Sequence, residues 1–205
     1  MNKMDLKQFF ITILLSIVMF AIYLVGILPV FANQQLSIVF HAGITALVCG
    51  PVFVLMLAKS KAPGTLFIFS ALFALFYLAV GNAYLCVFML VVGFVCELAM
   101  LKGGYASKIR PVLPYFLVWA AVGLKNIFMF GLFRDAVLET YLKTGMDEQA
   151  AQAAIQNASS VVMSVPLNLA GLAMVAIGAS LGCWIGRKAL EKHFFSAGVA
   201  ASDER

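Results

Sequence analysis

The chain has 205 residues, of which 63% are hydrophobic and only 11% are charged, and its formal net charge is +5. A soluble domain has about 25% charged residues, so this composition excludes a soluble globular protein and predicts a chain that folds in a lipid bilayer. The positive charge lies in gaps between apolar stretches, so we interpret it as a sign of membrane topology and expect no nucleic-acid partner.

Six apolar stretches predict membrane helices, because a crossing of the hydrocarbon core takes about 20 residues. They cover roughly residues 9–30, 36–58, 65–80, 84–101, 112–133 and 161–185. The first follows Lys3 and Lys7 as a signal peptide would, but it is longer than the apolar core of about 7–15 residues in such peptides. Gly81 and Asn82 favour a turn, so we expect the third and fourth helices to form a tight hairpin.

Basic residues fall mostly in alternate gaps between these stretches, and the other gaps hold only Arg134 and Lys143. Because basic residues resist translocation, the rich gaps predict the cytoplasmic side, with both termini inside. Residues 32–35, 81–83 and 134–160 are then outside. The rich gaps and ends hold Lys3, Lys7, Lys59, Lys61, Lys102, Lys108, Arg110, Arg187, Lys188, Lys192 and Arg205.

The external segment 134–160 is long and polar. Val137, Leu138 and Tyr141 form a helical stripe, Gly145 interrupts it, and an Ala- and Gln-rich run over 147–157 predicts a second short helix. Long loops with their own structure are often lids. The alternative is a plain helical connector that lies on the membrane surface.

Enzyme signatures are missing from the sequence. It has no Gly-rich phosphate loop, no carboxylate pair at helical spacing within an apolar stretch, no HExxH motif and no CxxC pair among its four cysteines. We therefore expect a non-catalytic protein with no cofactor and no intrinsic metal.

Lys125 is the sharpest anomaly, because it lies inside an apolar stretch, nine residues before Arg134. At 1.5 Å per residue it sits about 13 Å below the outer surface, where a charge usually faces a cavity or a partner. The alternative is an ion pair or a lysine that snorkels between helices. Asn126 follows it directly.

Three other polar side chains reach a similar depth from the outside: Tyr23, His41 and Asn168. If they converge with Lys125 and Asn126, they form a substrate site open to the exterior. His41 could equally be a hydrogen-bonded core residue, and a neutral imidazole is also a common metal or haem ligand.

Small residues recur every four positions in two predicted helices, and such spacing lets helix backbones approach closely. This pattern predicts either packing within the chain or docking to another membrane subunit. The two stripes are Gly178, Gly182 and Gly186, and Ala42, Ala46 and Gly50.

Three stretches carry a resemblance to a known family: Glu97–Arg110, Arg134–Glu139 and Gly178–Val199. In these stretches the chain resembles the Treponema–Streptococcus (Trep_Strep) family of integral membrane proteins, regarded as S components of energy-coupling factor (ECF) transporters. The resemblance extends from the first helix to Val199. It implies an all-α bundle of six membrane helices in a single domain, located in the bacterial cytoplasmic membrane.

The resemblance also implies partners, namely a membrane coupling subunit and two cytoplasmic ATPases. The S component would capture a micronutrient from outside, with haem or another tetrapyrrole as the first candidate and a vitamin-like molecule next. Members of this transporter class often dock through an Ala-x-x-x-Ala patch on the first helix. Here the comparable small residues are Ser16 and Ala21, five positions apart. A lipid-modifying membrane enzyme and an independent small carrier or channel remain the alternatives.

Overall fold

The computed structural model describes residues 4–27, 33–101, 103–107 and 109–195, and throughout these residues the regular elements are helices. The first half contains α1 (Leu6–Ile27), α2 (Gln34–Leu36), α3 (Ala42–Ser60), α4 (Thr65–Ala79) and α5 (Ala83–Met100). The second half contains α6 (Val112–Ile127), α7 (Arg134–Lys143), α8 (Glu148–Val162) and α9 (Val165–Ala189). Three π-helical segments extend this set: Ser37–His41 joins α2 to α3, Phe128–Leu132 continues α6, and Leu190–Phe195 continues α9.

One helix occupies most of each predicted membrane stretch, which confirms an all-α membrane protein. Five helices of the described chain are long and apolar enough to cross a bilayer, beginning at Leu6, Gln34, Ala83, Val112 and Val165. The sixth, α4, is apolar but has only 15 residues, or about 22 Å at 1.5 Å per residue. The end of the first predicted stretch, residues 28–30, lies outside the described residues.

The predicted sixth stretch begins later than expected. Residues 161 and 162 complete α8, and α9 starts at Val165 with a proline in its first turn. Proline removes a backbone N–H and is favoured at such a start, where that N–H has no partner within the helix. Pro166 therefore separates the external helix from the membrane helix.

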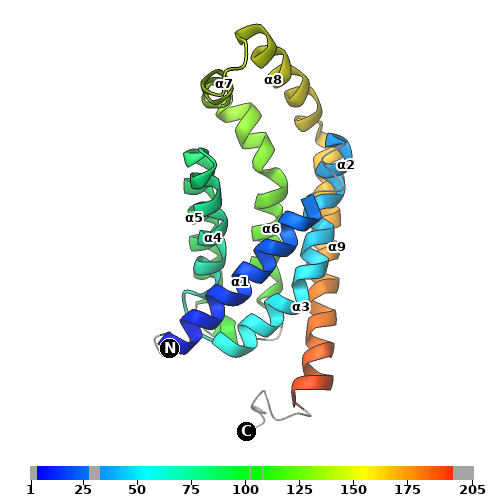
Figure 1. The fold of residues 1–205 in the computed structure, drawn as a ribbon. Helices are drawn as coiled ribbons and strands as arrows, with labels where there is room; N and C mark the ends of the chain where they lie inside the picture. The colour runs from blue at the N-terminus through cyan, green and yellow to red at the C-terminus, as the bar shows by residue number, and fades with distance from the viewer. Residues whose placement is uncertain (1–3, 28–32, 102, 108, 196–205) are drawn as a thin grey trace.

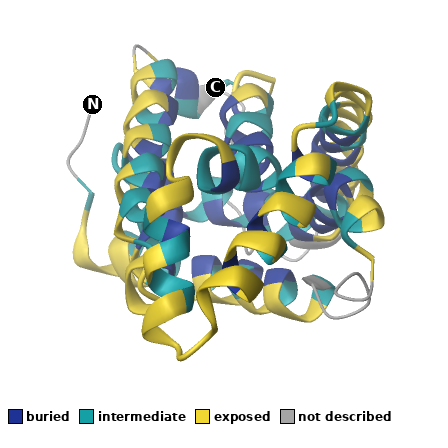
Figure 2. Cartoon of the chain, turned by 90° about the horizontal axis from the view of Figure 1, so that it is seen from above, coloured by how far each residue is buried: buried dark blue, intermediate teal, exposed yellow. Residues whose placement is uncertain are grey.

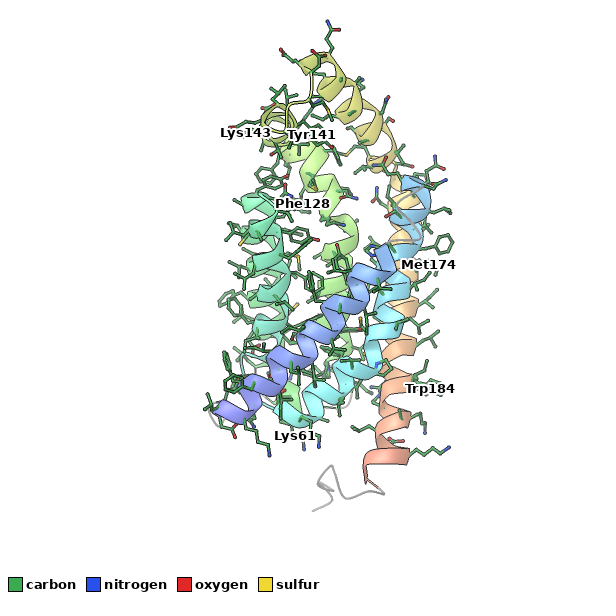
Figure 3. All side chains as sticks on the ribbon, viewed as in Figure 1. Lys61, Phe128, Tyr141, Lys143, Met174 and Trp184 are labelled. Carbon is green, nitrogen blue, oxygen red and sulfur yellow. The ribbon has the colours of Figure 1, made fainter. Side chains whose placement is uncertain are left out.

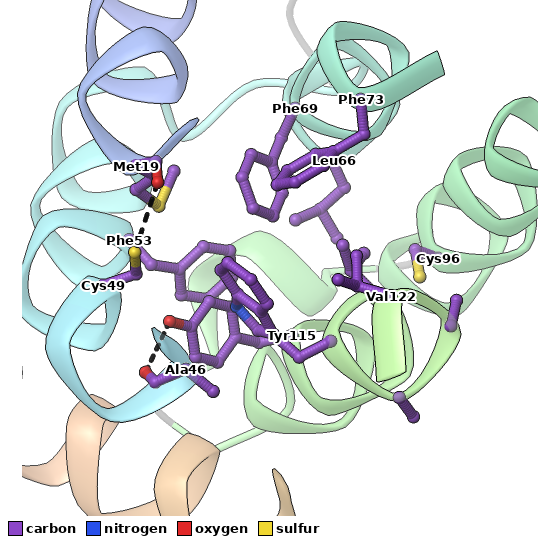
Figure 4. Close-up of a cluster of buried hydrophobic side chains, with 14 of the residues drawn as sticks. Met19, Ala46, Cys49, Phe53, Leu66, Phe69, Phe73, Cys96, Tyr115 and Val122 are labelled. Atoms are coloured by element: carbon purple, nitrogen blue, oxygen red, sulfur yellow. Dashed lines mark hydrogen bonds between the residues drawn. The ribbon is translucent and has the colours of Figure 1, made fainter. Parts of the chain in front are cut away.

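The six helices that occupy the predicted membrane stretches form a closed ring in the order α1, α4, α5, α6, α9 and α3. Its interior is filled by aromatic side chains from α3, α4 and α6 (Figure 4). Phe53 stacks on Tyr115 with ring centroids 4.2 Å apart, and the Tyr115 hydroxyl donates to the Ala46 carbonyl at 2.7 Å. Viewed along the bundle, exposed residues lie mainly around the outside (Figure 2). On α5 these are apolar, as lipid contact requires.

The two stripes of small residues pack against each other between α3 and α9. A Cβ atom at Gly182 would lie 2.7 Å from the Leu47 carbonyl oxygen, and one at Gly186 would lie 2.7 Å from Pro51 Cα. Both values are too short for a real contact, so the close approach depends on glycine. Both stripes are thus used for packing within the chain. Docking to a partner remains a prediction, and it would require another surface of the bundle.

The first-helix pair Ser16 and Ala21 does not share one face. Ser16 is buried, with its hydroxyl 3.6 Å from the Met56 sulfur, whereas Ala21 is exposed. Of this pair, only Ala21 is accessible to a partner.

The charged residues separate along the bundle. The start of α1 and the ends of α3 and α9 lie at one end, and α7 and α8 lie at the other (Figure 1). Lys61 and Lys143, which are labelled in Figure 3, accordingly lie at opposite ends of the bundle. Lys3, Lys102, Lys108 and Arg205 lie outside the described residues. We call the end that carries α7 and α8 the outer end, following the predicted topology, which stays a prediction.

Candidate functional site

Three of the five residues predicted to bind substrate come together inside the outer half of the ring. Tyr23 comes from α1, His41 ends the π-helical turn before α3, and Lys125 comes from α6. The rings of Tyr23 and His41 lie 5.0 Å apart between centroids, tilted by 48°. Tyr23 and His41 are 1% and 5% exposed, and the partly buried Lys125 lies within electrostatic range of the His41 imidazole. We call these three residues the outer polar cluster.

Lys125 reaches a main-chain oxygen one helical turn back. Its Nζ donates to the Val122 carbonyl at 3.2 Å and is partly buried. No carboxylate within the described residues lies at ion-pair distance from it. The described residues therefore give no support to an ion pair at Lys125. The ammonium has further N–H donors that a ligand could use.

Two aromatic residues beside the cluster were not singled out from the sequence. The Tyr77 and Tyr23 hydroxyl oxygens lie 3.4 Å apart, and the Trp119 ring lies 6.3 Å from the Tyr23 ring, tilted by 41°. The one sequence signal for Trp119 is its spacing from Asn126. It lies seven residues, or two helical turns, before Asn126, so the two residues share one face of the helix.

Two buried nitrogen atoms of the site, His41 Nε2 and Trp119 Nε1, make no hydrogen bond of good geometry, and the Trp119 indole lies within reach of the Tyr115 hydroxyl. A buried polar atom with no partner costs about 1–3 kcal/mol, and a bilayer offers no water to satisfy it. The indole nitrogen can only donate, whereas the imidazole nitrogen can donate or accept. His41 Nε2 is therefore the atom of the site best suited to contact a bound molecule.

Asn168 and Asn126 do not join this cluster. The Asn168 amide nitrogen donates to the carbonyls of Val162 and Ser164 at 2.7 and 2.9 Å, which closes the junction between α8 and α9. Asn126 is half-buried on α6, and its side chain makes no hydrogen bond to the described residues.

A hollow beside Asn168 has a cavity volume of about 10 Å³, which is room for about one water molecule. Ligand pockets usually measure about 300–1,000 Å³, so the hollow is far too small for a substrate. None of the outer polar cluster lines it. Its walls are Ile38, Ala120, Gly123, Leu124, Asn168, Gly171, Leu172 and Val175.

α7 and α8 cover the outer end of the bundle, and we call them the cap. They are the two helices expected over 134–160, with Gly145 in a left-handed conformation between them. Asp147 caps α8 by accepting from the Gln149 and Ala150 amides. A small core separate from the aromatic interior holds the cap down: Ile38, Phe130, Val137, Ile155 and Val162.

The outer face of the cap is solvated and charged. On α7, Lys143 Nζ lies 2.6 Å from Glu139 Oε1. The hydrogen bond and the charge of Lys143 lower the pKa of the exposed Glu139 carboxyl below its usual value. Arg134 bridges the two helices, donating to Gln156 at 3.4 Å.

Comparison with known proteins identifies one family. The model of a family described as hypothetical bacterial integral membrane protein (Trep_Strep) matches residues 6–195. No curated protein and no solved structure matches the chain.

Proposed function

The chain belongs to the Trep_Strep family of bacterial integral membrane proteins, and from this premise we propose that it is the substrate-binding S component of an ECF-type importer. In this role it captures a micronutrient from outside the cell. A membrane coupling subunit and two cytoplasmic ATPases supply the energy, and the chain itself is not an enzyme.

The observation that carries this proposal is the outer polar cluster beneath the cap. An ammonium, an imidazole and a phenol converge from three helices in the outer half of a closed ring. Polar and ionisable groups are costly within a bilayer and usually mark a substrate path. Their position favours a ligand that arrives from outside.

Haem or another tetrapyrrole is the first candidate substrate, and a vitamin-like molecule is the next. His41 Nε2 is buried without a partner, as an axial ligand to haem iron would be before haem binds. A tetrapyrrole is far larger than the hollow of about 10 Å³ beside Asn168, so capture requires the cap or the interior side chains to move. In a haem-loaded protein, His41→Ala should abolish the spectrum of coordinated iron.

The alternatives receive less support from the residues. A lipid-modifying enzyme would need a carboxylate or metal cluster, and no group of three potential metal ligands occurs among the described residues. An independent carrier often shows an inverted repeat, and the sequence has none that we detect.

Mass spectrometry of small molecules that co-purify with the chain tests the proposal most directly. We expect one water-soluble nutrient or tetrapyrrole at near one-to-one stoichiometry, reduced in the Lys125→Met variant. If only phospholipids co-purify, and Lys125→Met leaves their amount unchanged, the chain is not a nutrient-binding subunit.

A further inference from the structure

The Lys125 ammonium turns away from the outer end of the bundle. α6 runs toward the cap (Figure 1), and Val122, whose carbonyl oxygen accepts from Lys125 Nζ at 3.2 Å, lies about one helical turn farther from the cap than Lys125 does. A lysine that snorkels extends its ammonium toward the headgroups. Lys125 folds back in the opposite direction, so its charge stays within the membrane-spanning part of the bundle.

No negative charge of the described chain accompanies this ammonium. The other members of the outer polar cluster are a phenol and an imidazole, and no described carboxylate lies at ion-pair distance from Lys125 Nζ. A charge within the bilayer usually has a partner, so Lys125 lacks a counter-ion. The described acidic residues lie at exposed positions of the cap or near the opposite end of the bundle: Asp135, Glu139, Asp147 and Glu148 on the cap, and Asp5, Glu97 and Glu191 near the opposite end.

The packing of α6 changes at the level of Lys125. Residues 118–122 are all buried, whereas residues 123–129 are all half-buried. Seven residues cover about two helical turns, so no face of α6 is fully packed over this length. The tightly packed interior along α6 therefore ends just before Lys125, on the side that the cap covers (Figure 1). A group that enters from the outer end meets the ammonium at this border.

A single ammonium matches a single negative charge. A carboxylate carries one charge and accepts several hydrogen bonds, which suits an ammonium with further donors beside a phenol hydroxyl. A phosphate monoester carries about −1.5 to −2 charges at neutral pH, which Lys125 alone does not balance. A cation would be repelled by Lys125.

We infer that the substrate carries a carboxylate, which becomes the counter-ion of Lys125, and that this site rejects cationic nutrients. The inference rests on the proposed function and narrows its substrate class to acids. It applies both to a tetrapyrrole with acidic side chains and to a vitamin-like acid. The phosphate of a lipid headgroup also offers negative charge, so the test separates these two sources.

The test compares each acid with a neutral derivative of the same molecule. The purified full chain is placed in nanodiscs of phosphatidylcholine, a lipid without net charge. The probe pairs are haem and its dimethyl ester, lipoate and lipoamide, and nicotinate and nicotinamide, and thiamine is the cation. Equilibrium dialysis measures their affinities for the wild type, Lys125→Met and Lys125→Arg.

We expect at least one acid to bind, and its neutral derivative to bind about tenfold more weakly, the scale of a lost hydrogen bond to a charged group. Thiamine should not bind. Lys125→Met should lower the affinity for the acid to that for the neutral derivative, whose unchanged affinity shows that the site is still folded. Lys125→Arg keeps the charge and should keep the preference for the acid. If Lys125→Met does not fold, Lys125→Gln takes its place.

Equal binding of an acid and its neutral derivative to the wild type would overturn the inference. So would binding of thiamine, or a preference for the acid that survives in Lys125→Met.

If no probe binds, mass spectrometry of the co-purified molecule decides. A carboxylic acid supports the inference, whereas a neutral or cationic nutrient overturns it and leaves the importer intact. If only phospholipid co-purifies, and less of it with Lys125→Met, the ammonium pairs with a lipid phosphate, and both the inference and the importer are wrong.

Discussion

At Lys125 the bundle holds an ammonium whose only described hydrogen bond goes to a neutral carbonyl oxygen. Lys125→Met keeps the length of the side chain and removes its charge. We expect it to weaken binding of the co-purified molecule by roughly 1.5–3 kcal/mol, the scale of a hydrogen bond to a charged group. Titration of the purified variant with that molecule measures the change.

Lys143→Met is the matched control, because it removes an ammonium from the exposed outer face of α7, where Lys143 pairs with Glu139. It should leave affinity unchanged, since exposed pairs are worth little. Equal affinity in both variants and in the wild type would show that Lys125 only snorkels between helices.

How far sequence can identify such residues depends on contrast with their surroundings. Lys125 and His41 stand out because a cation and an imidazole are rare in apolar stretches, and both lie in the outer polar cluster. Trp119 and Tyr77 do not stand out, since aromatic residues fill the rest of the interior as well. Asn168 was expected at the site, but its amide closes the local junction between α8 and α9. The sequence alone does not show whether an asparagine binds substrate or makes such a local hydrogen bond.

Among the elements, α3 and α9 make the tightest helix pair in the bundle. A side chain at Gly178 would collide with the main chain at Gly43. Gly178→Leu should therefore lower the stability of the fold by about 1–3 kcal/mol or more, as overpacking does. Thermal unfolding of the purified protein would show this as a lower Tm.

Ala176→Leu provides the control for this substitution, since it places the same side chain on the exposed side of α9. It should leave the Tm nearly unchanged. If both variants unfold at the wild-type temperature, the close approach of α3 and α9 does not contribute to stability.

The cap is held to the bundle mainly by a small core of its own, which is the arrangement expected of a unit that opens locally. We expect amide hydrogens of α7 and α8 to exchange faster in the empty protein than in the protein loaded with the co-purified molecule. Hydrogen exchange followed by mass spectrometry measures this difference, with α5 as the internal reference. Equal exchange in both states would make the cap a plain connector.

Sequence predicted most elements because their breaks carry clear signals. Gly81 and Asn82 separate α4 from α5, and Gly145 separates α7 from α8. The boundary at Pro166 was missed, because Val161 and Val162 continue the apolar pattern although they belong to α8. The π-helical turn that ends at His41 was not expected either, since its residues do not differ in type from those of an α-helix.

At the scale of the whole molecule, the basic residues divide between the two ends of the bundle. We expect Gln35→Cys and Thr144→Cys, both at exposed outer positions, to react with a membrane-impermeant thiol reagent added to intact cells. Cysteine at exposed Arg110 should react only after the cells are opened. Reaction of Gln35→Cys and Thr144→Cys only from the cytoplasmic side would reverse the topology.

The order of helices around the ring could not be predicted from the sequence. Every membrane helix is apolar on both its lipid-facing and its interior side, so hydrophobicity does not show which face is buried. Side-chain volume carries part of this information: glycines mark the α3–α9 contact, and large aromatic residues of α3, α4 and α6 mark the interior. These differences in side-chain volume can be interpreted only when the arrangement of the helices is known.

The importer role makes a final prediction about the complete assembly. No phosphate-binding Gly-rich loop occurs in the sequence, so the chain alone should bind its substrate but not accumulate it. Proteoliposomes that contain only this chain and ATP should bind the co-purified molecule without concentrating it. Addition of the coupling subunit and two ATPases should give ATP-dependent accumulation, which the Lys125→Met variant should show only weakly. ATP-driven accumulation by the chain alone would contradict the S-component role.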